Sequence, residues 1–457
     1  MERRPLLGPT FEEMLHPETV APAIRERALA AASEDPLDPI NLFNIRWCDP
    51  DGSLRYYLVP PELTGVDAPI AMMYSRDFPT GSHKVGAAYS VLMDLQLEGA
   101  VDPEKHTLVW PSTGNYGIGG AWVGCRMGYD CLVILPEEMS DERFQIIERY
   151  GARVTKTPGC ESNVKEIYDE CHRLRAADAN VRVLNQFEVL GNYRFHYYVT
   201  GNSAAAVAED LAAQGVGDGK VAAFVSSMGS SGTIAAGDRL KQLNPEHRIV
   251  GLEPIQCPTL FANGYGGHDI QGIGDKHVTW IHNVNNMDLM MCIDDMACKR
   301  GLQLLTDPVG TRYLREELGI AEDAAERLAS TMGISGVCNL LGAIKTAKFC
   351  DLGPDDLIIT VATDAIDRYH SVMADLDDRF GALDAAEARA RKQSIFDAAG
   401  LDWIQEGTRL NRARWHNLKY YTWVEQQGRT VEELDAQKDQ AWWREIQGAI
   451  AGIDEHN

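Results

Sequence analysis

Residues 220–237, KVAAFVSSMGSSGTIAAG, decide the fold class because they join a buried strand to a helix through a glycine-rich loop. The run KVAAFV is apolar at successive positions, as a strand covered on both faces of a parallel sheet must be. The loop and the helix start consist of Gly229, Ser230, Ser231, Gly232 and Thr233. At the positive end of a helix, their backbone N–H groups and hydroxyls can surround a phosphate. No Gly-Lys-Ser/Thr follows, so this is not a Walker A loop, and a tight turn without a ligand is the alternative.

The same alternation of strand and helix extends from about residue 70 to about residue 365, which predicts an α/β fold with a parallel sheet. One helix is expected to begin after Ser140, to bury Phe144 and Ile147 on one face, and to end at Gly151. The predicted strands are PIAMMYS (69–75), HTLVW (106–110), DCLVIL (130–135), ARVTKT (152–157), KVAAFV (220–225), RIVGLE (248–253) and DLIITVA (356–362).

Composition and charge exclude several classes of protein. The 457 residues carry a net charge of -24, which disfavours nucleic-acid and membrane partners because both are anionic. The first eighteen residues, MERRPLLGPTFEEMLHPE, lack the apolar core of a signal peptide, so we expect a cytoplasmic protein. The ten cysteines form no CxxC pair, which predicts reduced thiols and no metal site.

The sequence beyond about residue 380 is charged and helical in character. It contains five of the nine tryptophans, at positions 403, 415, 423, 442 and 443. Thr430 and Glu433 match the capping-box pattern at the start of a helix. We expect a helical extension that packs its tryptophans on the main body or on a second subunit, without a catalytic role.

Lys84 is the first candidate for chemistry. It follows a Pro-Thr-Gly-Ser turn and His83 in SRDFPTGSHKVGAAYS (75–90), before a run of small apolar residues. A lysine in a dry cleft is deprotonated more readily, which suits a covalent link to an aldehyde cofactor. An isolated lysine would simply be a surface cation.

A second loop, PSTGNYGIGG (111–120), follows another predicted strand. The amide of Asn115 can hold a strained turn or bond an anionic ring oxygen. The glycines do not follow the spacing GxGxxG, which counts against a nicotinamide-dependent dehydrogenase. Because ligands collect at the carboxyl ends of parallel strands, this loop, the loop at 226–233 and the segment TDAIDRYHS (363–371) should face one crevice.

Taken in order, these motifs resemble the fold-type-II pyridoxal-phosphate enzymes, the group of cysteine synthase, cystathionine β-synthase and the tryptophan synthase β chain. The resemblance covers roughly residues 70–370. It rests on PTGSHK (79–84), PSTGNYG (111–117), LPEEMSDERFQIIERYGARV (135–154), NQF (185–187), MGSSGT (228–233), LEP (252–254) and HDIQGIG (268–274).

The resemblance implies pyridoxal 5'-phosphate as cofactor and a role for each matching residue. Lys84 would be the Schiff-base lysine and the proton shuttle at Cα, while Asn115 would bond the ring oxygen of the cofactor. The phosphate would lie against Gly229, Ser230, Ser231, Gly232 and Thr233. The substrate would contact Ser112, Thr113, Gly114, Asn115, Tyr116, Gln186 and Gly272, with its carboxylate on Ser112, Thr113 and Gln186.

Three departures from the family pattern concern the cofactor ring and the substrate. A gap-free match places Ala365 where the family has a serine against the pyridine nitrogen, which leaves Thr363 or Asp364 as the partner. Tyr116 replaces a small residue of cysteine synthases and should reshape the pocket. The sequence Asp-Lys-His at 275–277 replaces a mostly apolar mouth, so it either meets a polar substrate tail or faces solvent.

The implied architecture has a large cofactor-binding domain (1–84 and 200–380), a small domain with the substrate loop (85–199) and the helical extension (381–457). The implied activity is β-elimination or β-replacement on a cysteine- or serine-type amino acid through an aminoacrylate, by a homodimer. The alternatives are a catalytically silent regulatory or binding subunit of the same fold and, less favoured, the dehydrogenase.

Overall fold

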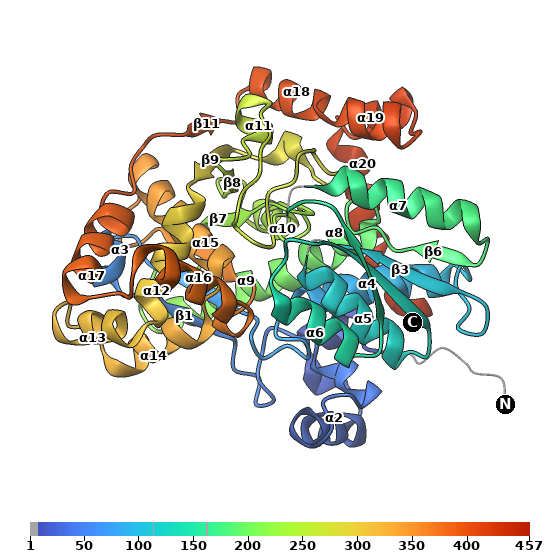
Figure 1. Ribbon diagram of the computed structural model, residues 1–457, viewed down its shortest axis with the longest axis horizontal. Helices are drawn as coiled ribbons and strands as arrows, with labels where there is room; N and C mark the ends of the chain where they lie inside the picture. Colours follow the sequence, from blue (N-terminus) through green and yellow to red (C-terminus); the bar gives the residue numbers. More distant parts are fainter. Residues whose placement is uncertain (1–7, 113, 161–162) are drawn as a thin grey trace.

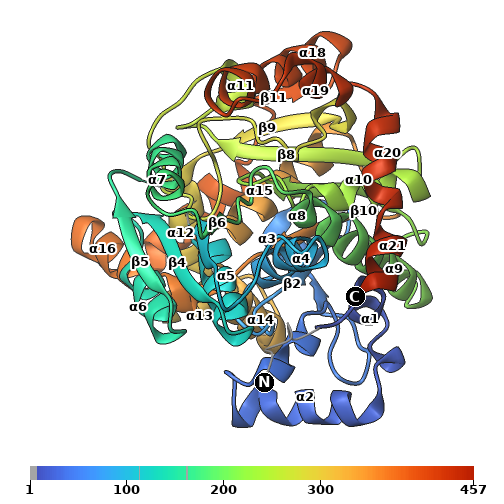
Figure 2. The same cartoon turned by 90° about the vertical axis from the view of Figure 1, so that its right-hand side faces the viewer.

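The structure is a computed structural model that describes residues 8–112, 114–160 and 163–457. Two β-sheets carry the fold, and helix α4 packs between them against α5 and α8 (Figures 1 and 2). This arrangement confirms the predicted α/β class.

The larger sheet has seven strands in the order β1-β2-β10-β7-β8-β9-β11. The five inner strands are parallel, and β1 and β11 pair antiparallel at the two edges. The strands are β1 (Tyr56–Leu58), β2 (Ile70–Tyr74), β7 (Val221–Ser227), β8 (Arg248–Pro254), β9 (Leu289–Ile293), β10 (Leu357–Ala362) and β11 (Ile404–Glu406).

The smaller sheet is parallel throughout, in the order β5-β4-β3-β6. Its strands are β3 (Thr107–Pro111), β4 (Asp130–Pro136), β5 (Arg153–Thr157) and β6 (Val181–Val183). The helices α5 and α7 contact β3 and β4. The helices of this region are α4 (Lys84–Leu97), α5 (Asn115–Arg126), α6 (Asp141–Arg149) and α7 (Val164–Ala177).

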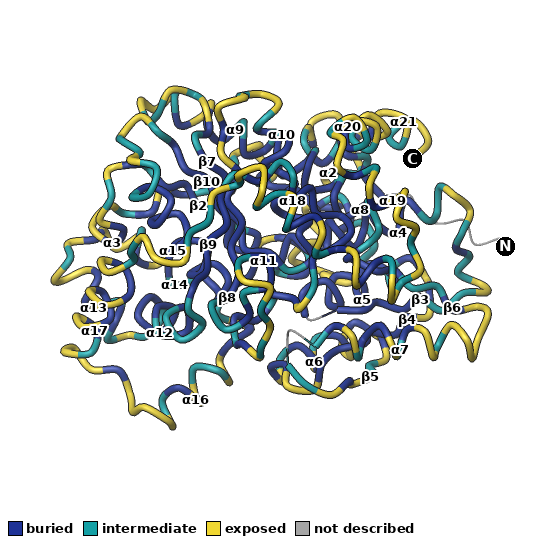
Figure 3. Tube along the Cα trace, turned by 90° about the horizontal axis from the view of Figure 1, so that it is seen from above, coloured by how far each residue is buried: buried dark blue, intermediate teal, exposed yellow. Residues whose placement is uncertain are grey.

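Successive residues of the inner strands enter different cores, because side chains alternate across a sheet. In β10, Ile358 packs with the helices α12, α14 and α15, whereas Ile359 joins the core that contains α4 and α9. Figure 3 shows these strands buried and the outer helices exposed. The remaining helices up to residue 380 are α1 (Phe11–Leu15), α2 (Pro22–Glu34), α3 (Pro61–Thr64), α8 (Leu190–Phe195), α9 (Gly201–Ala213), α10 (Ala235–Leu243), α11 (Thr259–Ala262), α12 (Asp295–Thr306), α13 (Pro308–Glu316), α14 (Glu322–Thr331), α15 (Ile334–Phe349) and α16 (His370–Phe380).

The C-terminal segment wraps around the rest of the molecule (red in Figure 1) and ends beside α1 (Figure 2). Trp415, Trp423 and Trp443 are fully buried, and the Nε1 of Trp423 donates to the Val278 carbonyl at 2.8 Å. The expected docking on the main body is therefore confirmed for these three, whereas Trp403 is 37% exposed. The helices are α17 (Ala385–Arg391), α18 (Arg409–Asn417), α19 (Val431–Ala436), α20 (Gln440–Gly448) and α21 (Ile450–His456). The capping box predicted at the start of α19 is present.

All seven predicted strands exist, and four further strands were not predicted: β1, β6, β9 and β11. The run LMMCI of β9 has only one β-branched residue, Ile293, of the kind that favours a strand, and the other three strands have only three residues each. The prediction that the strands are buried on both faces is wrong for β5, which lies at the edge of its sheet. The strand β11 belongs to the segment that was expected to be a helical extension.

In the described part of the chain, no single helix is long and apolar enough to cross a membrane, although the pair α14 and α15, bent by 120°, passes the same length and composition test together. None of the ten cysteines forms a disulfide there. The described residues also contain no cluster of three or more His, Cys, Asp or Glu side chains suited to a metal ion.

Candidate active site

Lys84 is buried at the first residue of α4, where the chain enters the core after β2. The turn before it closes through a hydrogen bond from the Gly81 N–H to the Phe78 carbonyl at 2.7 Å, and Gly81 has a φ of 71°, which favours glycine. The Nζ of Lys84 donates to Ser230 Oγ at 3.1 Å. The lysine is therefore not a surface cation, and it contacts the glycine-rich loop.

His83 connects the same two regions from inside the core. Its ring nitrogens lie 3.4 Å from Ser75 Oγ and 3.2 Å from Thr233 Oγ1, and its ring packs on Trp47 at 5.5 Å between centroids. Burial, with the nearby positive charge of Lys84, holds the pKa of His83 well below its usual value. A neutral imidazole in this place positions the loop.

The loop from Gly229 to Thr233 leaves β7 and leads into α10. Within the described chain, the backbone N–H groups of these five residues donate to no carbonyl of the protein. Ser231 has a φ of 61°, a left-handed conformation that non-glycine residues adopt mainly where surrounding structure enforces it. The loop thus presents a set of open donors at a helix start.

Asn192 and Thr279 support this loop from outside. The amide nitrogen of Asn192 donates to Ser230 Oγ at 3.0 Å, and Thr279 Oγ1 donates to the Ser230 carbonyl at 3.0 Å. A Cβ on Gly232 would lie 2.1 Å from Asn192 Oδ1, so this position requires glycine.

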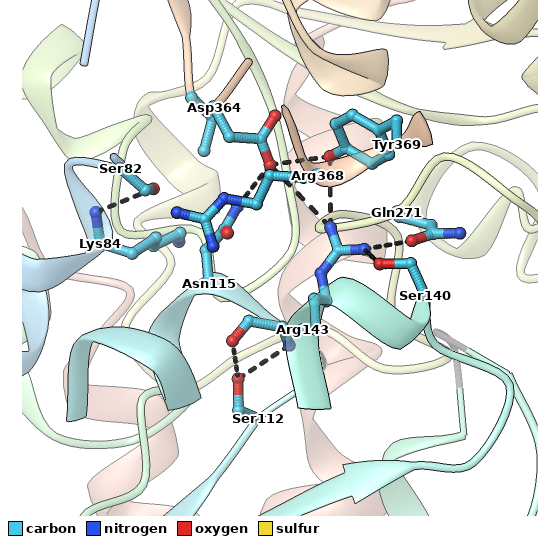
Figure 4. A network of polar contacts seen from close by, with 12 residues as sticks. Ser82, Lys84, Ser112, Asn115, Ser140, Arg143, Gln271, Asp364, Arg368 and Tyr369 are labelled. Carbon is cyan, nitrogen blue, oxygen red and sulfur yellow. Dashed lines mark hydrogen bonds and ion pairs between the residues drawn. The ribbon is translucent and has the colours of Figure 1, made fainter. Parts of the chain in front are cut away.

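Asn115 joins the smaller sheet to the end of β10. Its amide Nδ2 donates to Asp364 Oδ2 at 2.6 Å, although the two residues come from different sheets (Figure 4). Asn115 Oδ1 is buried and has no hydrogen-bond partner within the described residues. Two of the three loops predicted to share a crevice therefore meet here.

Asp364 lies at the centre of a buried polar network (Figure 4). Its Oδ2 also accepts from the Tyr369 hydroxyl at 2.7 Å, and Arg143 Nη2 lies 3.9 Å away. Arg143 in turn donates to Ser140 Oγ at 2.9 Å and to Gln271 Oε1. Burial raises the pKa of Asp364, and the positive charge of Arg143 opposes that increase.

Ser112 builds the turn before α5. Its Oγ accepts from the N–H groups of Gly114 at 2.9 Å and Gly117 at 2.7 Å, and it donates to the Gly114 carbonyl at 3.2 Å. Gly114 is the N-cap of α5, with a φ of 157°. Thr113, predicted to contact the substrate, lies outside the described residues.

Gln186 and Tyr116, also predicted to contact the substrate, are buried near the smaller sheet. Gln186 Nε2 donates to the Pro111 carbonyl at 3.5 Å, which places it beside the turn that Ser112 forms. Tyr116 packs edge-on against Trp110, and its hydroxyl donates to the Leu184 carbonyl at 3.1 Å. The tyrosine ring therefore belongs to the core of the smaller sheet.

Thr363 and Arg368 flank the network. The Thr363 carbonyl accepts from Ser75 Oγ at 2.7 Å, which fixes the end of β10 to the end of β2. Arg368 is buried and donates to the Thr80 carbonyl in the turn before Lys84. The segment 363–371 thus lies against the lysine turn as well as against Asn115.

The segment 271–277 covers the phosphate loop. The Gly274 N–H donates to the Met228 carbonyl at 2.8 Å, and Gly272 has a φ of 100° with open space at its Cβ position. Asp275 is buried, Lys276 is exposed, and His277 is half-buried with its Nε2 3.2 Å from the Tyr168 hydroxyl. Of the two alternatives left open for these residues, exposure to solvent is confirmed for Lys276 and is wrong for Asp275.

Sequence reasoning missed Arg143, Asn192, Arg368 and Tyr369. Arg143 looked like one charged residue of an amphipathic helix, but it is fully buried. Ser140 is the N-cap of α6 as predicted, yet its hydroxyl binds Arg143 rather than a backbone N–H group. Arg143, Arg368 and Tyr369 lie within segments that were singled out from the sequence (135–154 and 363–371), whereas Asn192 lies in none of them.

Comparison with known proteins places this geometry in a family. Residues 74–364 match the family described as pyridoxal-phosphate dependent enzyme. The chain is 29% identical over 295 residues to a probable cysteine synthase of Bacillus subtilis, which covers 64% of this chain and 85% of the relative. It is 30% identical over 295 residues to a cysteine synthase of Staphylococcus aureus, with coverage of 64% and 84%.

The fold agrees with solved structures. The crystal structure of a cysteine synthase from Entamoeba histolytica superposes with a TM-score of 0.60 at 22% identity, and covers 75% of this chain and 93% of that chain. The family match spans the lysine, the Asn115 turn, the glycine-rich loop and the end of β10. The chain therefore belongs to the pyridoxal-phosphate-dependent enzyme family.

Proposed function

We propose that this protein catalyses β-replacement or β-elimination on a serine- or cysteine-type amino acid, with pyridoxal phosphate bound between its two sheets. The observation that carries the proposal is the contact of the buried Lys84 with Ser230, because it brings the candidate Schiff-base lysine against the candidate phosphate loop. The similarity to cysteine synthases supports the substrate class.

The described residues fit this cofactor. The open backbone N–H groups of Gly229–Thr233 suit a phosphate, the buried Oδ1 and Nδ2 atoms of Asn115 can face a ring substituent, and Lys84 can reach an aldehyde. When bound, pyridoxal phosphate supplies an electron sink that stabilises negative charge at the substrate Cα. The partner of the ring nitrogen is Thr363 or Asp364: the Asp364 carboxylate accepts from Asn115 and Tyr369 through Oδ2, whereas its Oδ1 is buried without a hydrogen-bond partner among the described residues.

The roles of the other residues follow from their positions. The Nζ of Lys84 removes the proton from the substrate Cα, because it is the basic group buried at the loop. The substrate carboxylate binds at the start of α5, where Ser112 fixes the turn and Gln186 lies alongside. Gly272 lines the cleft through its backbone, and Tyr116 shapes it indirectly by packing on Trp110.

We further propose that residues 85–199, with the smaller sheet, and residues 1–84 and 200–380, with the larger sheet except its edge strand β11, act as two domains that close over the substrate. Residues 381–457, which include β11, would be a fixed extension. Glu142 on α6 supports this idea because it accepts from the Ser371 N–H at 3.0 Å and from Ser371 Oγ at 2.9 Å, at the start of α16. Closure excludes water, which decides how far replacement competes with hydrolysis. A small-angle scattering comparison with and without substrate tests the closure, and identical profiles would contradict it.

The spectroscopic test uses the purified protein with pyridoxal phosphate, beside a Lys84→Ala variant. We expect a visible absorbance band in the wild type that borohydride removes, and no such band in the variant. The loaded protein is then mixed with O-acetylserine, O-phosphoserine, serine and cysteine. No band and no turnover in the wild type would favour the silent binding subunit instead.

We also propose that the protein is a cytoplasmic homodimer. The absence of disulfides among its ten cysteines supports a reducing compartment. Light scattering on the full chain tests the dimer, and a monomeric mass would contradict it.

A further inference from the structure

We propose that Asp275 is the acid and base that serves the leaving group and the incoming nucleophile at the substrate Cβ, a task separate from that of Lys84. The proposal rests on the proposed function. It starts from the departure of GIGDKHVT (272–279) from the apolar mouth of related enzymes.

The position of Asp275 in the segment 271–275 supports this role. At one end of the segment, Gln271 accepts from Arg143 of α6, and at the other end the Gly274 N–H donates to Met228, directly before the phosphate loop. A Cβ on Gly229 would lie 3.1 Å from the Gly272 carbonyl oxygen, so the two stretches are in contact. The segment therefore spans the site from the smaller sheet to the phosphate loop, and Asp275 stands at the phosphate-loop end.

The carboxyl group of Asp275 is held inside the protein without an ion-pair partner in the described chain. Its backbone carbonyl accepts from Thr259 Oγ1 at 2.9 Å, which anchors the residue, while Oδ2 is buried and makes no hydrogen bond. A buried carboxyl oxygen without a partner is costly, so such groups usually need an explanation in function. Transient contact with a substrate atom supplies one.

The titratable groups near Asp275 come from three neighbouring parts of the chain. The positive charge of Lys84 on α4 lowers the pKa of Asp275, but burial outweighs that effect and raises the pKa to about 7. Cys257, before α11, and Tyr168, on α7, lie near it: burial raises the pKa of both above their usual values, and the Asp275 carboxylate raises them further. Both are therefore neutral near pH 7, and Asp275 can hold or release a proton there.

The proposed chemistry balances protons and electrons. As the bond from Cβ to the leaving sulfur or oxygen breaks, its electron pair stays on the leaving atom, and Asp275 gives that atom its proton. The resulting carboxylate then takes the proton of an incoming thiol or water, whose lone pair forms the new bond to Cβ. A leaving acetate needs no such proton, because it is a weak base, whereas a thiolate or hydroxide does.

The experiment compares Asp275→Asn with the wild type and with Lys276→Gln, which changes the exposed residue next to Asp275 in the chain. All three proteins are loaded with pyridoxal phosphate, and the borohydride-sensitive band shows whether the cofactor is bound. Rates of leaving-group release are measured in single turnovers without an added thiol, with O-acetylserine, cysteine and serine, so that only the proton transfer to the leaving group is compared. Infrared difference spectra of the cofactor-free wild type and variant, recorded from pH 5 to 9, detect the protonated carboxyl group directly.

We expect Asp275→Asn to keep the cofactor band, to lose about 10²- to 10⁴-fold in rate with cysteine and serine, and to lose less than about tenfold with O-acetylserine. The infrared carboxyl signal should titrate near pH 7 in the wild type and be absent in the variant. Lys276→Gln should match the wild type throughout.

Three outcomes would overturn the inference. An equal loss with all substrates, with the band intact, would make Asp275 a structural residue. An unchanged rate with cysteine and serine, or an infrared signal that does not titrate between pH 5 and 9, would remove its proton-transfer role. These three results leave the proposed function standing, whereas a wild type without band or turnover refutes the function and the inference together.

Discussion

The amide of Asn115 donates a 2.6 Å hydrogen bond to the carboxylate of Asp364, and this contact joins the loop after β3 to the loop after β10. Asp364 is buried, and the same carboxylate oxygen accepts from Tyr369 and lies 3.9 Å from Arg143. One carboxylate thus compensates a buried guanidinium and fixes the amide that faces the cofactor site.

Replacement of Asp364 by alanine should lower the free energy of unfolding by about 3–5 kcal/mol, because it removes the buried carboxylate that lies 3.9 Å from the buried Arg143. Urea denaturation measures this loss. Asp375→Ala is the matched control, since Asp375 pairs with Arg379 on the exposed face of α16 and should cost about 0.5 kcal/mol or less. A similar cost for both variants would show that the network adds nothing to an ordinary surface pair.

Replacement of Gly232 by alanine should weaken cofactor binding. The new Cβ would lie 2.1 Å from Asn192 Oδ1, and this overpacking costs about 1–3 kcal/mol. If the strain falls on the loop, the Kd for pyridoxal phosphate rises roughly 5- to 150-fold. Equilibrium dialysis measures the Kd, with Gly448→Ala at the end of α20 as control, since a Cβ there meets nothing within 4 Å. An unchanged Kd in Gly232→Ala would show that Asn192 yields without moving the loop.

The parts of the site that the sequence predicted are those contained in one continuous motif. Lys84 after its turn and the loop from Gly229 to Thr233 are local features, because a strand end, a glycine-rich turn and a helix start follow one another along the chain. That the loop at 111–120 and the segment 363–371 face one crevice also followed, since ligands collect at the carboxyl ends of parallel strands, but the contact between Asn115 and Asp364 was not predicted.

The site residues that the sequence did not predict owe their positions to contacts between segments far apart in the chain. Arg143 is buried only because Gln271 and Tyr369 from the larger sheet meet α6, and no periodicity along α6 encodes that contact. Likewise, the sequence Asp-Lys-His at 275–277 was equally compatible with a substrate contact and with exposure to solvent. Asp275 is buried in the structure, where residues 272–274 pack on the phosphate loop. Local patterns predict elements, but they do not give the partner of a polar side chain.

The C-terminal extension should be required for a stable fold. Trp443 packs against Tyr193 at 5.1 Å between ring centroids, and its Nε1 donates to the Gln437 carbonyl at 3.1 Å. Trp443→Ala should therefore cost about 3–5 kcal/mol in the free energy of unfolding. Trp403→Ala is the control, because Trp403 is 37% exposed and should cost about 1 kcal/mol or less. If the two variants unfold at the same urea concentration, the extension packs too loosely to stabilise the main body.

Glu253 gives the stability of the protein a dependence on pH. It lies at the end of β8, accepts from the N–H groups of Leu260 and Phe261, and burial raises its pKa to about 7. Because the folded state keeps the proton more tightly than the unfolded state, the contribution of this carboxyl group to stability falls as the pH rises from about 4.5 to about 7.

Glu253→Gln removes this titration. The free energy of unfolding of the variant, relative to the wild type, should rise by up to roughly 3 kcal/mol between pH 5 and pH 8, whatever constant cost the amide adds. Urea denaturation at a series of pH values measures the difference, and the buried histidines cancel because they are common to both proteins. Glu246→Gln, an exposed control, should show a constant difference from the wild type. A constant difference for Glu253→Gln as well would mean that the Glu253 carboxyl group ionises in the folded protein as easily as in the unfolded chain.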